Sequence, residues 1–416
     1  MKMENNGMIY QAGKQKARDM LKTPFYYVKE KDLQYDVDML RSSLDENWEN
    51  YIMSYSVKTN NLPWLLLYLK EKGFYAEVVS ETEYDLACRL GFENRRIVYN
   101  GPIKDRKAFE KVLLAGGYVN MDSSEELAWM EELSFIYPNR KFKVGVRVNF
   151  DIARLCPEED YVENGGRFGY CYETGVLKQV IERMNGLGNV MISGLHLHFS
   201  SRSRAVSVYE QMARLAIEIA REYELNLDYI DMGGGYFGGL EGKQNYHDYF
   251  KAIGAVLHTY FTPEQTKLIV EPGVSLISRA MSFETSVKDV KQIRDVCFVV
   301  TDGSRVNLNP LTSRQDYANH IVWQDDAQTR SKRPSQWICG FTCMDSDRLF
   351  ELKEEAELKP GDRIVYDRAG GYTMCLTPMF IQYSPAVYLE RADESIVQLR
   401  ETWGNEEFLQ KNRREL

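Results

Sequence analysis

Short apolar runs alternate along the first two thirds of the chain with longer segments whose apolar positions recur every three or four residues. Short apolar runs are typical of strands buried on both faces, and the longer spacing is typical of amphipathic helices. The pattern predicts eight strands, over residues 52–57, 74–79, 96–100, 117–121, 143–149, 191–199, 228–232 and 267–271. Between them it predicts helices over residues 61–72, 81–91, 104–116, 124–135, 174–186, 204–223 and 246–260.

Two of these helices carry a start signal. Ser80 and Ser123 are each followed three residues later by a glutamate, Glu83 or Glu126, which is typical of a capped helix. Strands that alternate with helices predict an α/β fold, either a closed (β/α)8 barrel or an open doubly wound sheet. Eight strands within residues 25–275 favour the TIM-like barrel.

The pattern changes after residue 275. Strand-like runs near residues 283–290, 295–301, 337–342 and 363–367 follow one another with few helical periods between them. We therefore predict a second, mainly β domain over residues 276–416, to which residues 1–24 also contribute. The charged end of the chain, residues 404–416, is expected to be a solvated helix or a frayed tail.

Composition narrows the possible partners and surroundings. The 416 residues carry a net charge of -9, which argues against nucleic acid or an anionic membrane as a partner. The longest apolar run, residues 62–68, is too short to cross a bilayer, and the N-terminus has no signal-peptide pattern. Seven scattered cysteines indicate reduced thiols in the cytoplasm, and neither they nor the five histidines have zinc-binding spacing, so no metal site is expected.

Residues able to do chemistry gather where the predicted strands end. Lys58 follows the first strand, Glu77 lies in the second, His198 closes the sixth, Gly233–Gly235 follow the seventh and Glu271 ends the eighth. Any one of them alone would be an ordinary loop or turn residue. Because barrel enzymes hold their active sites at the carboxyl ends of the strands, their joint placement predicts a site.

This set suits pyridoxal 5′-phosphate (PLP). The cofactor needs a lysine for its Schiff base, a carboxylate that keeps its pyridine nitrogen protonated and a flat side chain to stack on its ring. Its phosphate needs close backbone N–H groups, which glycines expose, and barrels commonly place phosphate after strands seven and eight. The triple glycine falls at that point.

Seven ordered motifs resemble those of the fold-type III PLP-dependent decarboxylases, the group of the diaminopimelate, ornithine and carboxynorspermidine enzymes. They occupy residues 55–60 (YSVKTN), 77–83 (EVVSETE), 196–201 (HLHFSS), 232–236 (MGGGY), 271–273 (EPG), 343–347 (CMDSD) and 370–373 (GGYT). The resemblance covers nearly the whole chain and implies an alanine-racemase-like barrel with a C-terminal β domain.

The resemblance also implies roles for single residues. Lys58 would form the Schiff base, His198 would stack on the ring, and Glu271 would pair with the pyridine nitrogen. Cys343 would reach the active site of a partner subunit, where it or Lys58 would return a proton to Cα. The further cofactor contacts that it implies are Glu77, Ser201, Gly233, Gly234, Gly235, Gly273 and Tyr372. A cysteine that acts across an interface implies a homodimer with shared active sites.

Departures from the family pattern fall on the contacts that hold substrate and phosphate. Val274 stands where an arginine usually helps to hold the phosphate, and Met344 stands where an acid usually reads the distal amine of the substrate. Each lost charge-assisted hydrogen bond costs about 1.5–3 kcal/mol. Diaminopimelate is therefore disfavoured, and Asp345, Asp347 and Asn309 are the candidate substrate contacts.

These observations predict PLP-dependent decarboxylation of an α-amino acid, in amino-acid or polyamine metabolism. Two alternatives stay open. One is a PLP-dependent racemase or epimerase, in which Lys58 and Tyr372 would act on opposite faces of Cα. The other is a non-catalytic PLP-binding homologue, which the altered substrate motifs permit.

Overall fold

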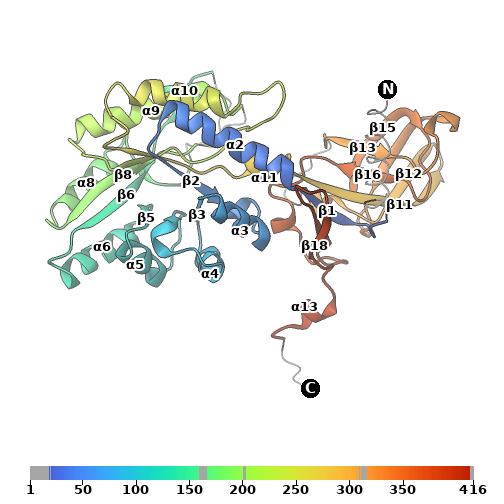
Figure 1. The fold of residues 1–416 in the computed structure, drawn as a ribbon, viewed down its shortest axis with the longest axis horizontal. Coiled ribbons are helices and arrows are strands. Elements are labelled where there is room, and N and C mark those ends of the chain that lie inside the picture. Colours follow the sequence, from blue (N-terminus) through green and yellow to red (C-terminus); the bar gives the residue numbers. More distant parts are fainter. Residues whose placement is uncertain are drawn as a thin grey trace. The chain divides into compact units, whose positions relative to one another are not determined.

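The computed structural model describes residues 18, 20–158, 166–199, 203–308, 310 and 316–412 (Figure 1). The chain divides into two compact units, one comprising Tyr35–Leu276 and the other comprising Met1–Gln34 with Ile277–Leu416. None of the described helices is both long enough and apolar enough to cross a membrane.

The first unit is a closed barrel of eight parallel strands. They are β2 (Tyr51–Ser56), β3 (Tyr75–Val78), β4 (Ile97–Tyr99), β5 (Tyr118–Met121), β6 (Phe142–Asn149), β8 (Val190–His196), β9 (Tyr229–Asp231) and β10 (Lys267–Val270). The ring closes because β5 pairs with β6 and β10 pairs with β2, where Ile269 lies opposite Ile52. The predicted barrel is confirmed, and the open doubly wound sheet is wrong.

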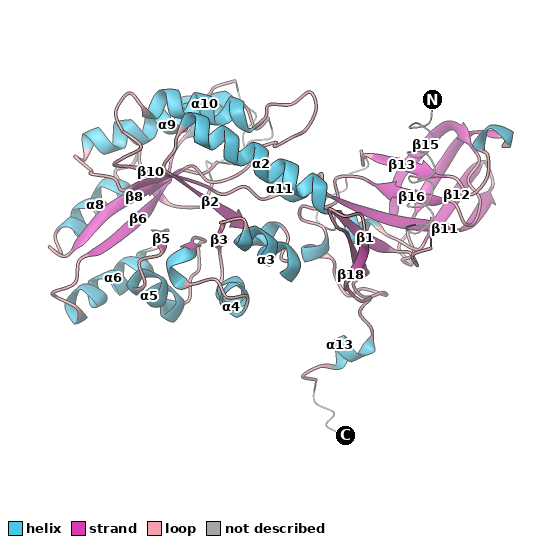
Figure 2. Cartoon of the chain, viewed as in Figure 1, coloured by secondary structure: helices cyan, strands magenta, loops and turns pink. Residues whose placement is uncertain are grey.

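Helices lie outside the barrel strands (Figure 2). They are α2 (Glu30–Asn47), α3 (Pro63–Glu71), α4 (Glu81–Arg89), α5 (Arg106–Leu114), α6 (Ser124–Ile136), α8 (Val176–Asn185), α9 (Val206–Glu222) and α10 (Tyr246–Leu257), with the short α7 (Ile152–Leu155), β7 (Tyr170–Cys171) and α11 (Val274–Ile277) between them. The predicted caps are present, because the hydroxyls of Ser80 and Ser123 accept from the backbone N–H groups of Glu83 and Glu126.

The long helix α2 before the first barrel strand was not predicted, although its signal is in the sequence. Leu33, Val37, Leu40 and Leu44 are all fully buried, at the spacing of one helix face.

Tyr229 is a large part of the packing in the amino-terminal half of the barrel. Gly145 on β6 and Gly194 on β8 make room for Tyr229, since a Cβ at either glycine would lie 2.1 or 2.0 Å from atoms of its side chain. Barrel interiors are packed in layers, and Tyr229 packs here with buried apolar side chains of β2, β4 and β10. Its hydroxyl donates to Asn120 Oδ1 at 2.8 Å, so polar side chains form the layer above it.

The second unit is mainly β, as its sequence pattern indicated. It comprises β1 (Phe25–Lys29), β11 (Met281–Ile293), β12 (Val296–Thr301), α12 (Arg305–Leu308), β13 (Asn319–Val322), β14 (Lys332–Cys339), β15 (Arg348–Ala356), β16 (Arg363–Tyr366), β17 (Ala386–Glu390), β18 (Ile396–Arg400) and α13 (Asn405–Leu409). Strand β1, which falls within the range assigned to the barrel from sequence, instead pairs with β11 and β17 of this sheet.

Candidate active site

A lysine and a buried carboxylate meet at the carboxyl ends of β2 and β3. Lys58 lies in the single turn Val57–Thr59 that directly follows β2, and its Nζ is 2.7 Å from Glu77 Oε2. Ser56 Oγ donates to the same carboxylate oxygen at 2.6 Å and accepts from Lys58 Nζ at 2.7 Å. The Lys58 side chain is 39% exposed and that of Glu77 only 1%, so the amine is accessible while its counter-ion is not.

The charge of Lys58 decides the ionisation of Glu77. Burial acts to raise the pKa of Glu77, but the positive charge and hydrogen bond of Lys58, with further hydrogen bonds from Ser56 and Asn100, bring it below its ordinary value. Glu77 is therefore a carboxylate at neutral pH and holds Lys58 in a defined position.

A second acidic group lies at the ends of β9 and β10. Burial raises the pKa of Glu271 well above its ordinary value, and the nearby Asp231 and Glu77 raise it further. Burial likewise raises the pKa of Asp231 to about 7, although the backbone N–H of Gly233 donates to its Oδ1 at 3.0 Å. Because Glu271 and Asp231 share a hydrogen bond, the pair holds a proton at neutral pH.

His196 completes this acidic cluster. One atom each of His196, Asp231 and Glu271 lies within 4.8 Å of the others, which is close enough for metal ligands. However, burial lowers the pKa of His196 well below its ordinary value, and the two acids retain a proton that a metal would have to displace. A proton-accepting base such as a ring nitrogen matches the cluster better than a cation does.

His198 lies half-buried beside the glycine loop after β9. Its Nδ1 accepts from the backbone N–H of Gly234 at 3.3 Å. Burial, reinforced by the charges of Arg147 and Lys58, lowers the pKa of His198 to about 3. The imidazole is therefore neutral at physiological pH and offers a flat, uncharged face.

The glycine loop is a cradle that side chains would fill. Gly233 and Gly235 have φ of 63° and 94°, a region that other residues rarely adopt. A Cβ at Gly233 would lie 2.4 Å from His198 Nδ1, and one at Gly234 would lie 2.2 Å from the carbonyl oxygen of Glu271. The backbone N–H groups of Gly233 and Gly234 already donate to Asp231 and His198, so the missing side chains mainly leave room for an anionic group such as a phosphate to approach the loop.

Gly273 serves a similar purpose beside the lysine. A Cβ there would lie 2.1 Å from Thr59 Oγ1, so only glycine lets the segment after β10 approach the Lys58 turn. The structure therefore brings together Lys58, Glu77, His198, Glu271 and the four predicted glycines. Ser201 and Asn309 lie outside the described residues.

The remaining predicted residues lie in the second unit. Cys343 and Asp345 are exposed, while Tyr372 is 42% exposed and has φ of 55°, an uncommon backbone conformation for a bulky residue. Asp347 is 4% exposed, and both of its carboxylate oxygens accept hydrogen bonds from Ser304 Oγ at 2.8 Å. Its role as a substrate contact is therefore corrected: it holds its own loop together.

Sequence reasoning missed three buried polar residues of this network. Asn100, Asn120 and Asp231 lie at or near the ends of β4, β5 and β9 and are at most 2% exposed. Asn100 Nδ2 donates to Glu271 Oε1 at 2.5 Å and to Glu77 Oε1 at 3.2 Å. A polar residue that closes an apolar strand run was the available signal.

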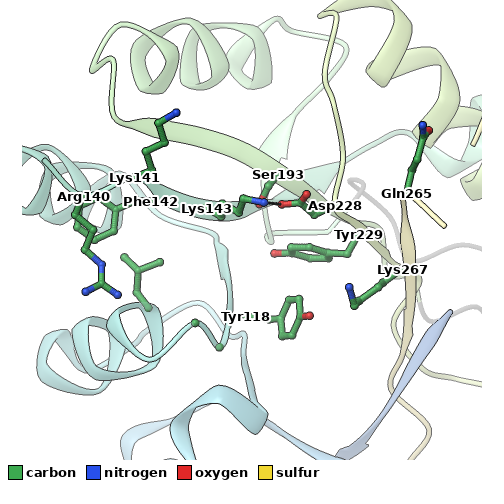
Figure 3. A pocket seen from close by; sticks show the side chains of 13 residues that line it. Tyr118, Arg140, Lys141, Phe142, Lys143, Ser193, Asp228, Tyr229, Gln265 and Lys267 are labelled. Atoms are coloured by element: carbon green, nitrogen blue, oxygen red, sulfur yellow. Dashed lines mark ion pairs between the residues drawn. The ribbon is translucent and has the colours of Figure 1, made fainter. Parts of the chain in front are cut away.

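A cavity of about 340 Å³ lies at the opposite, amino-terminal end of the strands (Figure 3). Its lining includes Tyr118, Lys267 and the ion pair of Lys143 with Asp228. Figure 3 shows the ring of Tyr229 facing this cavity. Because none of its lining residues belongs to the Lys58 cluster, this cavity is separate from the candidate active site.

The amino-acid sequence is similar to a protein-family model and to several known decarboxylases. A family model described as "Pyridoxal-dependent decarboxylase, pyridoxal binding domain" matches residues 35–278. The probable chloroplastic diaminopimelate decarboxylase of Oryza sativa subsp. japonica is 28% identical, over 91% of this chain and 77% of that protein. The L-glutamyl-(BtrI acyl-carrier protein) decarboxylase of Niallia circulans is 24% identical, over 86% of each chain.

Solved structures of known decarboxylases have a fold similar to that of this chain. The diaminopimelate decarboxylase from M. jannaschii in co-complex with L-lysine has a TM-score of 0.81 and 21% identity, over 94% of this chain and 92% of that one. The family match, which spans more than half of the 416 residues, includes the lysine turn, the glycine loop and Glu271. As its motifs predicted, the chain belongs to the pyridoxal-dependent decarboxylase family and is an amino-acid decarboxylase whose cofactor is PLP.

Proposed function

We propose that the chain removes the α-carboxylate of an amino acid at the carboxyl ends of its barrel strands, with Lys58 as the residue that bonds to PLP. The observation that carries this proposal is one buried network with the accessible Lys58 amine at one end and the proton-holding Glu271–Asp231 pair at the other. The glycine cradle lies beside Glu271, and Gly273 lies against the Lys58 turn.

The residues present fit the cofactor. Lys58 would carry it, the loop of Gly233, Gly234 and Gly235 would leave room for its phosphate, and Gly273 would let the adjoining loop approach. When bound, PLP supplies a protonated ring that accepts the electron pair left on Cα after CO₂ departs. The positive backbone φ of Tyr372 is consistent with a further contact to the phosphate, since uncommon backbone conformations cluster at functional sites.

Each polar side chain has a defined task in this proposal. Glu77 keeps the Lys58 amine oriented and charged until the amine reacts. Glu271 and Asp231 would hold the proton that the ring nitrogen requires, and Glu271 would be the carboxylate that pairs with that nitrogen. The neutral imidazole of His198 would stack against the ring without competing for a proton.

Cys343 is proposed to return a proton to Cα from a second copy of the chain, with two shared sites per homodimer. Its thiol is free and exposed in the second unit, as such a role requires. Mixing the variants K58A and C343A tests this proposal. If each active site combines two chains, the mixture regains activity that neither variant has alone. Inactive mixtures of two folded dimers would contradict shared sites.

The substrate is proposed to be an α-amino acid whose distal end is not read by an acid beside Cys343, because Met344 occupies that position and is 51% exposed. Asp345 remains as an accessible carboxylate on the same loop. We further propose a cytoplasmic enzyme of amino-acid or polyamine metabolism, which the seven free cysteines support.

The deciding experiment combines attachment and chemistry. The protein is incubated with PLP, reduced with borohydride and digested, and the modified peptide is located by mass spectrometry. L- and D-amino acids are then supplied while released CO₂ is measured. We expect modification at Lys58 and CO₂ from one substrate. Exchange of the Cα proton without CO₂ would identify a racemase, and no modification in the parent would overturn the proposal.

A further inference from the structure

The amide of Asn100 lies between the two acidic groups of the site. Asn100 directly follows β4, is 2% exposed, and is anchored by its backbone N–H, which donates to the Val78 carbonyl at 2.9 Å. Its Nδ2 donates to Glu77 Oε1 at 3.2 Å and to Glu271 Oε1 at 2.5 Å. The two N–H groups of this primary amide therefore donate to two different carboxyl groups.

A hydrogen-bond chain dictates which way this amide points. Asn100 Oδ1 accepts from Asn120 Nδ2 at 2.9 Å, while Asn120 Oδ1 accepts from the Tyr229 hydroxyl at 2.8 Å. Asn120 Nδ2 also donates to Asp231 Oδ2 at 3.1 Å. A flipped Asn100 would turn its oxygen toward two acids and its N–H groups toward another donor, so only one orientation is stable.

We propose that Asn100 is a positioning residue that ties Glu77, the counter-ion of Lys58, to Glu271, and that it favours the ionised form of Glu271 needed opposite the cofactor's ring nitrogen. This inference rests on the proposed function and deepens it. It assigns a role to a residue that none of the sequence motifs contains.

The charges around Glu271 explain why such a donor is needed. Among the described residues that shift its ionisation, Asp231 and Glu77 are acidic, and the single cation, Lys58, is already paired with Glu77. His196, whose Nε2 lies 3.7 Å from Glu271 Oε2, is neutral at physiological pH. The N–H group that Asn100 donates to Glu271 therefore stabilises negative charge where no unpaired cation among these groups does so.

Removing Asn100 should change the proton affinity of Glu271 in a predictable direction. Without Asn100, the carboxylate of Glu271 is less stabilised, so Glu271 retains its proton more strongly. A neutral Glu271 cannot stabilise a charged ring N–H, and the pKa of the cofactor's ring nitrogen falls. The loss of one hydrogen bond to a charged group corresponds to about tenfold, or about one pKa unit.

The test uses two variants and a matched control. N100L removes the amide at similar volume, and N100D keeps the shape but replaces the donor with another acid. The control is N149L, because Asn149 also ends a barrel strand but, among the described residues, its side chain donates to backbone carbonyls, at 2.8 Å to Phe168 and 3.3 Å to Gly166. Each holo-protein is loaded with PLP labelled with 15N in the ring, and the ring nitrogen is titrated by NMR.

We expect the ring-nitrogen pKa to fall by about one unit in N100L, to fall further in N100D and to stay at the parental value in N149L. A value in N100L within about 0.3 units of the parent overturns the inference, because a one-unit shift is the expected size. If N100L does not fold, N100D decides by the same criterion.

A second measurement tests the inference in variants that bind PLP too weakly for the NMR titration. The dissociation constant for PLP and the melting temperature of the cofactor-free protein are measured together. Weakening of PLP binding by about tenfold or more with an unchanged melting temperature supports the inference, and weakening below about twofold overturns it. If the parent itself fails to attach PLP at Lys58, the proposed function fails; if only the Asn100 result is negative, this inference alone fails.

Discussion

The two ends of the barrel carry the same kind of ion pair in different surroundings. Lys58 and Glu77 at the carboxyl end, and Lys143 and Asp228 at the amino end, each lie 2.7 Å apart. The Glu77 side chain is 1% exposed, whereas that of Asp228 is 43% exposed. Buried charges interact strongly and must be matched, while water screens exposed pairs. Burial, rather than the number of charges, therefore distinguishes the candidate active site.

Tyr229 separates the two ends. Its ring lines the amino-terminal cavity, and its hydroxyl bonds to Asn120 in the polar layer beneath the site. The same strands thus support a solvated end and a closed network of acids and amides. The following changes test this contrast, from the largest expected effect to the smallest.

Replacing Lys58 by alanine should have the largest effect. The variant loses the amine that bonds to PLP, so turnover should fall by about a thousandfold or more. The buried Glu77 also loses its cation, and its pKa should rise. Steady-state CO₂ release and borohydride trapping measure the first effect. Parental activity in K58A would refute the assignment of the lysine.

Replacing Asp231 by asparagine should change how stability depends on pH. Because the pKa of Asp231 is raised to about 7 in the folded protein, the folded state binds a proton that the unfolded chain releases above its ordinary pKa near 3.8. Stability of the cofactor-free protein should therefore be fully retained at low pH and decrease between about pH 4 and 7. The slope contributed by one proton is about 1.4 kcal/mol per pH unit.

Urea unfolding at several pH values compares the parent with D231N. The decrease should be smaller in D231N, because asparagine neither binds nor releases this proton. Glu271, whose pKa is also raised, contributes a residual decrease of the same sign. Identical pH profiles for the two proteins would show that Asp231 does not hold the proton.

Replacing Tyr229 by phenylalanine should have a moderate effect. The ring that fills the barrel remains, but Asn120 Oδ1 loses the hydroxyl that donates to it. An unsatisfied buried acceptor costs about 1–3 kcal/mol. Chemical denaturation measures this loss, and a neutral outcome would mean that water or a rearranged amide satisfies Asn120.

Replacing Lys143 by alanine should have the smallest effect. Its ion pair with Asp228 is exposed, and such pairs contribute about 0–1 kcal/mol. We expect parental turnover and nearly parental stability, measured in the same assays as K58A. A large loss of activity would show that the amino end of the barrel takes part in function.

Much of the barrel follows from local sequence patterns. Each predicted strand overlaps an observed one, because a strand buried on both faces needs a continuous apolar run wherever it lies. The capping serines were likewise identifiable from a three-residue spacing. By contrast, β1 was assigned to the wrong unit, since its partners β11 and β17 lie more than 250 residues further along the chain.

The candidate site divides in the same way. The sequence was enough to predict four parts of the site, because each lies in a contiguous motif at a strand end: Lys58, His198, the triple glycine and Glu271. The part played by Asn100, and the burial of Asp347 in its own loop, depend on which atoms lie within about 3 Å of each other. Sequence order specifies residue types and local periodicity, whereas shared protons and matched donors arise only where folding brings distant strands together and excludes water.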